Sequence, residues 1–379
     1  MKAPRPTFKR LGDLGNTPLT HRTPSLALAL FLALICAAAA ANPPISIDSK
    51  ADRGELEVRF KGRRLLVYAF ATNQFKPYLR ELYTLRGENV LRDAPPDHLH
   101  HHGLMYAVYV NGINFWEERS TSGYEVHDTL SRPSAMIDAK GMPVASFTEF
   151  IHWLAPTNRA SALLLNRGSP AISLSPSEGE RAGERGPSLP GGSGPQSASE
   201  CRGVLSQDAA LLVEQRTLTV TVDEKQQEVA LRWDSQFQVG PNAGKVTLHG
   251  SNYDGLGLRL PESFNHVARF QNSADQPYTG NNTQNVIPAQ WTSVSGVMDG
   301  REVMLVMFGR PDNARGDGFF FTMLDPFAYL SATQGLDKKP LEYSAGDKFS
   351  LNYLLTVYSE NKSPEFIRQR CALWDKERK

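Results

Sequence analysis

The chain has 379 residues, 40% of them hydrophobic, and its 41 basic side chains nearly balance its 40 acidic ones. This length and hydrophobic content allow one large domain or two ordinary ones, with a sizeable core. The near-neutral balance argues against a nucleic-acid partner, which usually requires a basic stripe, and leaves a small polar ligand open.

The first 41 residues have the pattern of a secretory signal peptide. A basic leader precedes the apolar run Leu26 to Ala41, LALALFLALICAAAAA, and the small residues that end this run suit a cleavage site. We therefore expect residues 1–41 to be removed and the protein to be secreted or periplasmic, with no stable membrane span. The run is close to the lower length limit for a transmembrane helix, so a retained anchor is the alternative.

The cysteine content indicates that disulfides do not stabilise the protein. The chain contains three cysteines, Cys36, Cys201 and Cys371. Cys36 would leave with the signal peptide, and the two that remain do not form a disulfide framework. Stability is therefore expected to come from core burial.

Beyond residue 50, the main pattern is an alternation of apolar and polar residues. The segment 228–239, EVALRWDSQFQV, places these apolar side chains on one face: Val229, Leu231, Trp233, Phe237 and Val239. Strand-like runs also occupy 146–155, 211–222, 301–309, 318–324 and 349–358. Because a period of two is typical of half-buried strands, the sequence predicts an all-β protein, a large antiparallel β-sandwich.

Helical spacing occurs at the C-terminus. Ser363 suits an N-cap and Pro364 suits the first helical position. The apolar and long side chains that follow repeat at helical spacing: Phe366, Ile367, Arg370 and Trp374. We therefore expect one C-terminal helix that packs against a sheet.

The segment 161–207 interrupts the strand pattern, because it is rich in Ser, Gly, Pro and charged residues. Such a composition cannot bury an apolar face, which indicates a disordered loop. Its flanks, 146–155 and 211–222, would form adjacent strands, so we interpret the segment as an insertion at a hairpin tip. Residues 42–379 would then form a single domain. The alternative is a linker between two domains.

The stretch Asp93 to Glu118, DAPPDHLHHHGLMYAVYVNGINFWEE, concentrates the candidate site residues. If the stretch were extended, His98, His100 and His102 would share one face and His101 would point to the other. Three imidazoles on one face form a candidate divalent-metal site, for example for Zn²⁺. The alternatives are His98, His100 and His101 as catalytic or sugar-binding groups without a metal, or structural histidines in a turn.

The same stretch ends in Trp116, Glu117 and Glu118. A tryptophan ring can stack on the apolar face of a pyranose while carboxylates bind its hydroxyls. Paired carboxylates can also cleave glycosidic bonds, so both glutamates are candidate acid/base groups. The alternative is a charged strand end in solvent.

Further candidates for substrate binding are Arg92, Asp97, Asn111, His266 and Arg315. Asp97 could orient an imidazole, and Arg92 could bind a carboxylate group. The chain has no phosphate-binding loop, dinucleotide fingerprint, serine nucleophile elbow or CxxC pair. We therefore expect no cofactor other than the divalent metal just considered.

Several separated motifs occur in the order found in a known family: Pro77-Tyr78, Arg92-Asp93, Pro95 to His98, His100-His101, Gly103 and Val110 to Trp116. Together with 253–261, 291–313 and 346–360, they resemble a family of secreted bacterial proteins, the domain of unknown function DUF6807, often labelled methane oxygenase PmoA. The resemblance covers most of 55–360. Where many relatives have an arginine after the histidine pair, this chain has His102.

The resemblance implies an exported β-sandwich similar in architecture to those of carbohydrate-acting proteins, and by analogy a carbohydrate-related role. The label implies a multi-span helical membrane protein. This chain has one signal-like apolar segment followed by β alternation, so methane oxidation is not expected. We expect an exported protein that acts on a carbohydrate or related polar substrate in a histidine-rich cleft. The alternative is a non-catalytic glycan-binding or structural β-sandwich module.

Overall fold

The computed structural model describes residues 43–131, 133–158, 209–278, 285–316 and 318–377. These residues belong to one compact unit, Pro43–Lys379. The predicted signal peptide, 1–41, and the predicted insertion, 161–207, lie outside the described residues.

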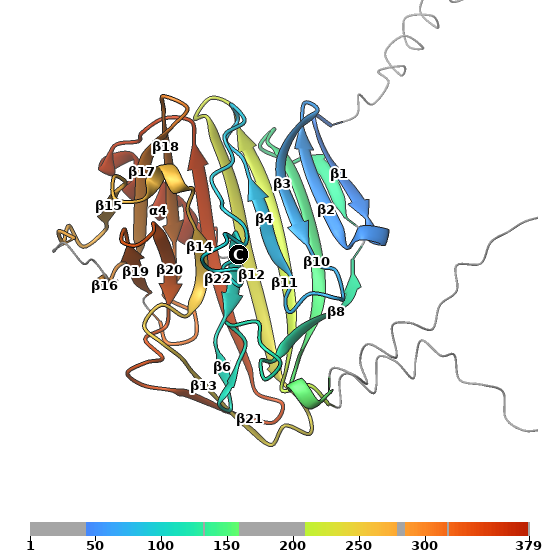
Figure 1. Cartoon of the computed structure of the whole chain (residues 1–379). Coiled ribbons are helices and arrows are strands. Elements are labelled where there is room, and N and C mark those ends of the chain that lie inside the picture. The colour runs from blue at the N-terminus through green and yellow to red at the C-terminus, as the bar shows by residue number, and fades with distance from the viewer. Residues whose placement is uncertain (1–42, 132, 159–208, 279–284, 317, 378–379) are drawn as a thin grey trace, which may run out of the picture. The chain divides into compact units, whose positions relative to one another are not determined.

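Antiparallel strands dominate the unit, and within the described residues they form three sheets (Figure 1). The first sheet has, in spatial order, β1 (Ile45–Lys50), β2 (Glu55–Phe60), β3 (Arg63–Ala69), β4 (Tyr78–Leu82), β5 (Leu104–Ala107), β14 (Gly255–Arg259), β20 (Tyr329–Thr333), β19 (Phe319–Met323) and β16 (Asn285–Pro288).

The second sheet contains β15 (Arg269–Asn272), β17 (Trp291–Met298), β18 (Arg301–Phe308), β22 (Lys348–Tyr358), β12 (Glu228–Val239), β11 (Leu212–Asp223), β10 (Pro143–Leu154) and β8 (Tyr124–Leu130), with β9 (Ser134–Ile137) beside β10. The third and smallest sheet contains β21 (Leu341–Ser344), β13 (Lys245–His249), β6 (Tyr109–Val110) and β7 (Ile113–Asn114). Short 3-10 turns are η1 (Ala51–Arg53), η2 (Pro156–Asn158) and η3 (Glu262–Phe264).

The two large sheets pack face to face around one main core. Tyr68 of β3 and Leu104 of β5 share a buried cluster with Trp153 of β10 and Leu231 of β12. Along β11, buried and half-buried residues alternate without interruption, as expected for a strand with one face in a core. The predicted all-β sandwich is therefore confirmed.

The strands on either side of the predicted insertion are neighbours in the second sheet. β10 and β11 pair antiparallel, from Trp153 opposite Leu212 to Val144 opposite Thr221. The chain leaves the described part after β10 and η2 and returns to it just before β11.

The C-terminal helix α4 (Pro364–Lys376) covers the outer face of the second sheet, as predicted. Its Ile367, Cys371 and Trp374 are buried in a second cluster with Phe308 of β18 and Leu354 of β22. Among the described residues, no helix combines the length and the hydropathy that crossing a bilayer requires.

Replacing the N-cap serine of this helix should destabilise the protein modestly. Ser363 Oγ accepts a hydrogen bond of 3.2 Å from the backbone N–H of Phe366. We expect Ser363→Ala to lower the free energy of unfolding by about 1 kcal/mol, since the N–H loses its partner. Urea unfolding measures the change. Ser363→Asn keeps an acceptor, so an equal loss in both variants would contradict this explanation.

Candidate functional site

The histidine block folds as consecutive tight turns. The backbone N–H of His98 donates to Pro95 O, that of His101 donates to His98 O, and that of Ala94 donates to His101 O, each at 2.9 Å. The expectation that alternate histidines share one face is therefore wrong, because it assumed an extended segment. The turns gather three rings: His98 stacks on His101 with centroids 4.5 Å apart, and His100 meets His101 edge-on at 4.6 Å.

These rings stand over the outer face of the first sheet. Along β5, Leu104 and Tyr106 point into the main core, whereas Met105 and Ala107 belong to a separate cluster on the opposite face. A cavity of about 360 Å³ lies on this opposite face. Its polar lining residues are His98, His100, His101 and Glu117. Its apolar lining is mainly Trp116, Tyr253, Phe321, Met323, Phe327 and Tyr329. We call this cavity the histidine pocket.

Local hydrogen bonds fix the wall of the pocket that carries Trp116 and Glu117. These two residues follow β7, and Asn114 Oδ1 accepts from both of their backbone N–H groups, at 2.7 and 3.0 Å. An asparagine that bonds to the backbone two and three residues ahead stabilises a tight turn. Glu117 also forms an ion pair with Arg119, 2.7 Å away.

One histidine of the pocket lining, His98, is paired with a carboxylate. His98 Nδ1 lies 3.0 Å from Asp97 Oδ2, and the buried Arg259 contacts the same oxygen through Nη2 at 3.1 Å. Slight burial opposes ionisation, but the hydrogen bond from His98 and the charge of Arg259 outweigh it and lower the pKa of Asp97 to about 2. Asp97 is therefore ionised at neutral pH, and it favours the tautomer of His98 with the proton on Nδ1.

The other two histidines of the pocket are uncharged at neutral pH. Burial lowers the pKa of His101 to about 2, with help from the neighbouring His100 and His98. Burial also lowers the pKa of His100, and the charge of Lys76 adds to this effect. A neutral imidazole can accept or donate a proton or a hydrogen bond, so the pocket offers polar groups without a fixed positive charge.

His102 points away from the pocket. Its Nδ1 lies 2.8 Å from Asp93 Oδ1, and its Nε2 lies 2.8 Å from Glu118 Oε1. Both ring nitrogens are occupied, so the candidate metal set of His98, His100 and His102 does not form. Among the described residues, no group of three or more His, Cys, Asp or Glu side chains is arranged to hold a metal ion.

Glu118 does not line the pocket either. It pairs with His102 and with Lys76, whose Nζ lies 3.0 Å from Glu118 Oε1. Burial favours the neutral acid, but the His102 hydrogen bond and the Lys76 charge outweigh it and lower the pKa of Glu118 to about 2. Because Glu118 is ionised at neutral pH and held by two cationic partners, it has no proton to donate. The role of catalytic acid expected for Glu118 therefore does not fit its position.

Two predicted arginines lie outside the pocket lining. Arg92 forms an ion pair with the exposed Glu262, at 3.2 Å. Arg315 donates to the backbone carbonyls of Lys339 and Pro340, and it lines a different cavity. Sequence proximity to the histidine block suggested Arg92, and a polar loop suggested Arg315, but neither pattern encodes the direction of a side chain.

Asn111 and His266 also lie elsewhere. Asn111 has a positive φ of 51° in the turn between β6 and β7, and its side chain bonds to the backbone of Lys245 and Thr247 in the third sheet. The side chain of His266 is 60% exposed, and its nearest charged partner is Asp325 at 3.6 Å. Neither residue lines the histidine pocket.

The sequence reading missed the residues that support the pocket from distant segments. Lys76, Arg259, Tyr253, Phe327 and Tyr329 come from three different parts of the chain, at 76, 253–259 and 327–329. The sequence contains a signal for the position of Tyr329. The run GLGLR of β14 includes Gly257, and a glycine inside a strand can mark a close approach. A Cβ at Gly257 would lie 1.7 Å from Tyr329 Oη.

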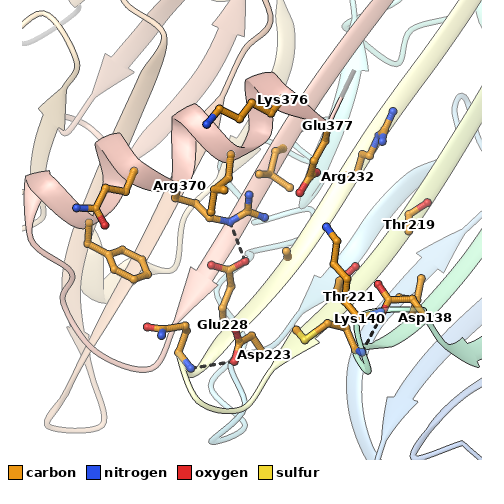
Figure 2. A pocket seen from close by; sticks show the side chains of 18 residues that line it. Asp138, Lys140, Thr219, Thr221, Asp223, Glu228, Arg232, Arg370, Lys376 and Glu377 are labelled. Carbon is orange, nitrogen blue, oxygen red and sulfur yellow. Dashed lines mark hydrogen bonds and ion pairs between the residues drawn. The ribbon is translucent and has the colours of Figure 1, made fainter. Parts of the chain in front are cut away.

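A larger cavity, about 920 Å³, lies between α4 and the outer face of β11 and β12. Figure 2 shows that charged side chains line it and that Arg370 of α4 is directed at Glu228 of β12, 3.1 Å away. Glu228 also accepts from the Tyr358 hydroxyl at 2.6 Å. The charges that line this larger cavity are balanced and partly paired, and no histidine is among its lining residues. The histidine pocket is therefore the stronger candidate site.

The chain is distantly similar to solved structures of α-galactosidases. The GH36 α-galactosidase AgaB from Geobacillus stearothermophilus is 9% identical, with 83% of this chain and 41% of that one covered and a TM-score of 0.43. The α-galactosidase from Lactobacillus brevis is 7% identical, with 85% and 40% covered and a TM-score of 0.40. The chain spans less than half of their length, and likenesses this distant say nothing about activity.

No curated protein matches the sequence. A family profile, described as a family of unknown function (DUF6807), matches residues 55–168 and 197–372. This match covers most of the chain, including every residue that lines the histidine pocket. The chain therefore belongs to the DUF6807 family.

Proposed function

We propose that the protein is exported and acts on a carbohydrate bound in the histidine pocket, with His98 as the general base. The observation that carries this proposal is the Asp97–His98 pair, whose histidine lines a pocket that combines aromatic rings with polar side chains. A sugar ring likewise has an apolar face and a rim of hydroxyls. About 360 Å³ suits a small ligand, at the lower end of typical binding sites.

The chemistry that fits best is proton transfer by histidine. With Nδ1 directed at Asp97, Nε2 of His98 is the nitrogen left to take a proton from the substrate. Glycosidases that use two carboxylates need both beside the scissile bond. Of the described residues, Glu117 is the only carboxylate that lines the pocket. We therefore assign Glu117 and His100 to binding hydroxyls or to assisting the leaving group.

One observation favours a second candidate function, a non-catalytic glycan-binding module. Glu117 is already paired with Arg119 at 2.7 Å, and most lining side chains are aromatic or apolar. A binding protein needs the same stacking surface and the same polar rim. Turnover of a bound glycan distinguishes the enzyme from the binding module.

Binding of a sugar should raise the melting temperature, and a change at Glu117 should remove about half of that rise or more. At a ligand concentration of 100 times Kd, stabilisation should be about 2.7 kcal/mol. We expect Glu117→Gln to weaken binding by about 10-fold or more, since a hydrogen bond to a charged group is lost. A thermal-shift screen of mono- and oligosaccharides, followed by calorimetry, measures both effects.

The matched control is Glu262→Gln, which removes a carboxylate at the surface, outside the pocket lining. It should bind as the unchanged protein does. If no sugar in the screen shifts the melting temperature, both candidate functions fail. If both variants weaken binding equally, the ligand does not occupy the histidine pocket.

A further inference from the structure

A chain of four paired charges lies directly behind the wall of the histidine pocket. Asp93 contacts His102 Nδ1 at 2.8 Å, His102 Nε2 contacts Glu118 at 2.8 Å, and Lys76 Nζ contacts the same Glu118 oxygen at 3.0 Å. The ring of Tyr78 stacks on His102 at 3.9 Å, and its hydroxyl donates to Asp93 at 3.3 Å. None of these five residues lines the pocket.

Lys76 connects this chain of charges to the pocket wall. Its side chain is 1% exposed, and Nζ donates to the backbone carbonyl of Trp116 at 3.0 Å as well as to Glu118. Trp116 and Glu117 line the pocket and Glu118 is the next residue. Besides the turn made by Asn114, the position of this wall therefore depends on one buried ammonium group and on the carboxylate that His102 shares with it.

The charges balance only while His102 carries a proton. Lys76 and protonated His102 then face Asp93 and Glu118, two positive against two negative. The other titratable group against the ring is Tyr78. Without the proton, one ring nitrogen has no hydrogen and presents a lone pair to a carboxylate oxygen, which is unfavourable in a partly buried site.

We propose that Lys76 and His102 are positioning residues, and that the charge on His102 regulates ligand binding by holding Trp116 and Glu117 in place. Burial opposes the charge, but the hydrogen bonds to Asp93 and Glu118 outweigh it and raise the pKa of His102 above its usual value. Because the pKa is raised, charged His102 holds the wall fully at acidic pH. This hold is lost as pH rises through the raised pKa of His102. The part of this proposal that concerns ligand binding rests on the proposed function.

The test compares the unchanged protein with His102→Arg, which carries a charge at every pH, and with His102→Gln, which never does. Deuterium exchange of residues 114–118, corrected for the intrinsic pH dependence of exchange, reports the wall without any ligand. Strand β12, residues 228–239, is the internal control. We expect protection of 114–118 in the unchanged protein to fall by about 10-fold from acidic to alkaline pH, with that of β12 constant.

The variants give the decisive contrast. His102→Arg should keep the protection at alkaline pH, and His102→Gln should lack it even at acidic pH. Affinity for a sugar found in the screen should follow the same pattern, with no pH dependence in His102→Arg. Constant protection of 114–118 in the unchanged protein overturns the inference, whether or not any variant folds. If no sugar binds, the proposed function fails, but the exchange measurement still decides the role of His102.

Discussion

Replacing Arg216 by methionine is expected to lower the free energy of unfolding by about 3–5 kcal/mol. Arg216, on β11, is fully buried between the two large sheets. Its guanidinium donates five hydrogen bonds, to both oxygens of Glu214 at 2.8 and 2.9 Å, to Glu125, to the Tyr68 hydroxyl and to the carbonyl of Pro77. Removing it leaves buried carboxylates without a countercharge.

The acidic side chains around Arg216 explain why the loss is large. Glu214, Glu125 and Glu149 are all buried. Tyr68 donates to Glu149, which also contacts His127 Nδ1 at 2.7 Å, so the carboxylates form one connected network. Burial already raises the pKa of Glu125 well above its usual value, even with Arg216 present. Without that charge, ionising these buried carboxylates would cost still more, because the medium around them screens charge poorly.

Urea unfolding at neutral pH measures the change, with Arg368→Met as the matched control. Arg368 forms an ion pair with Glu365 on the surface of α4, and both side chains are more than half exposed. The control should lose less than about 1 kcal/mol. A loss of that same small size in Arg216→Met would show that the buried network does not depend on its arginine.

Replacing His98 by glutamine is expected to lower the turnover number by about 100- to 10,000-fold, the usual contribution of a general base. His98 faces the pocket beside Asp97, which lies within 3.0 Å of Nδ1. Glutamine keeps a polar side chain but cannot take a proton. Because the side chain of His98 is 36% exposed, we expect little change in the melting temperature.

The assay follows the conversion of sugars identified in the binding screen. Asp97→Asn should also lose a large part of the turnover, because the asparagine no longer favours the reactive tautomer. His266→Gln is the control, since His266 lies at the surface and outside the pocket lining. Unchanged turnover in His98→Gln would refute the role of His98 as base. A sugar that binds but is never converted would instead favour the glycan-binding module.

Local patterns were sufficient for the architecture. The alternation in 228–239 predicted β12 (Glu228–Val239), and the five apolar residues named for that alternation lie on the core face of the strand. The same period predicted β11 and β22, and the serine–proline pair at 363–364 predicted the start of α4. These features depend on neighbours two to four residues apart, which a sequence displays directly.

Part of the site was also visible in the sequence. His98, His100, His101, Trp116 and Glu117 were candidates by residue type and spacing, and the structure brings all of them to one pocket. Which histidine faces which neighbour was not visible. The period-two reading grouped His102 with His98 and His100, whereas the turns direct His102 to Asp93 and Glu118. A run of turn residues has no fixed period, so spacing cannot predict the directions of its side chains.

Short-range patterns were enough to predict the β-sandwich, its C-terminal helix and the stretch that carries the candidate site, because apolar periodicity and capping residues act between near neighbours. The tertiary fold places Arg259 of β14 against Asp97 and directs Lys76 to the carbonyl of Trp116. It also decided that Tyr329 of β20 covers Gly257. These contacts join segments 40 to 162 residues apart in the chain. Sheet pairing and burial set them, and no local pattern records them.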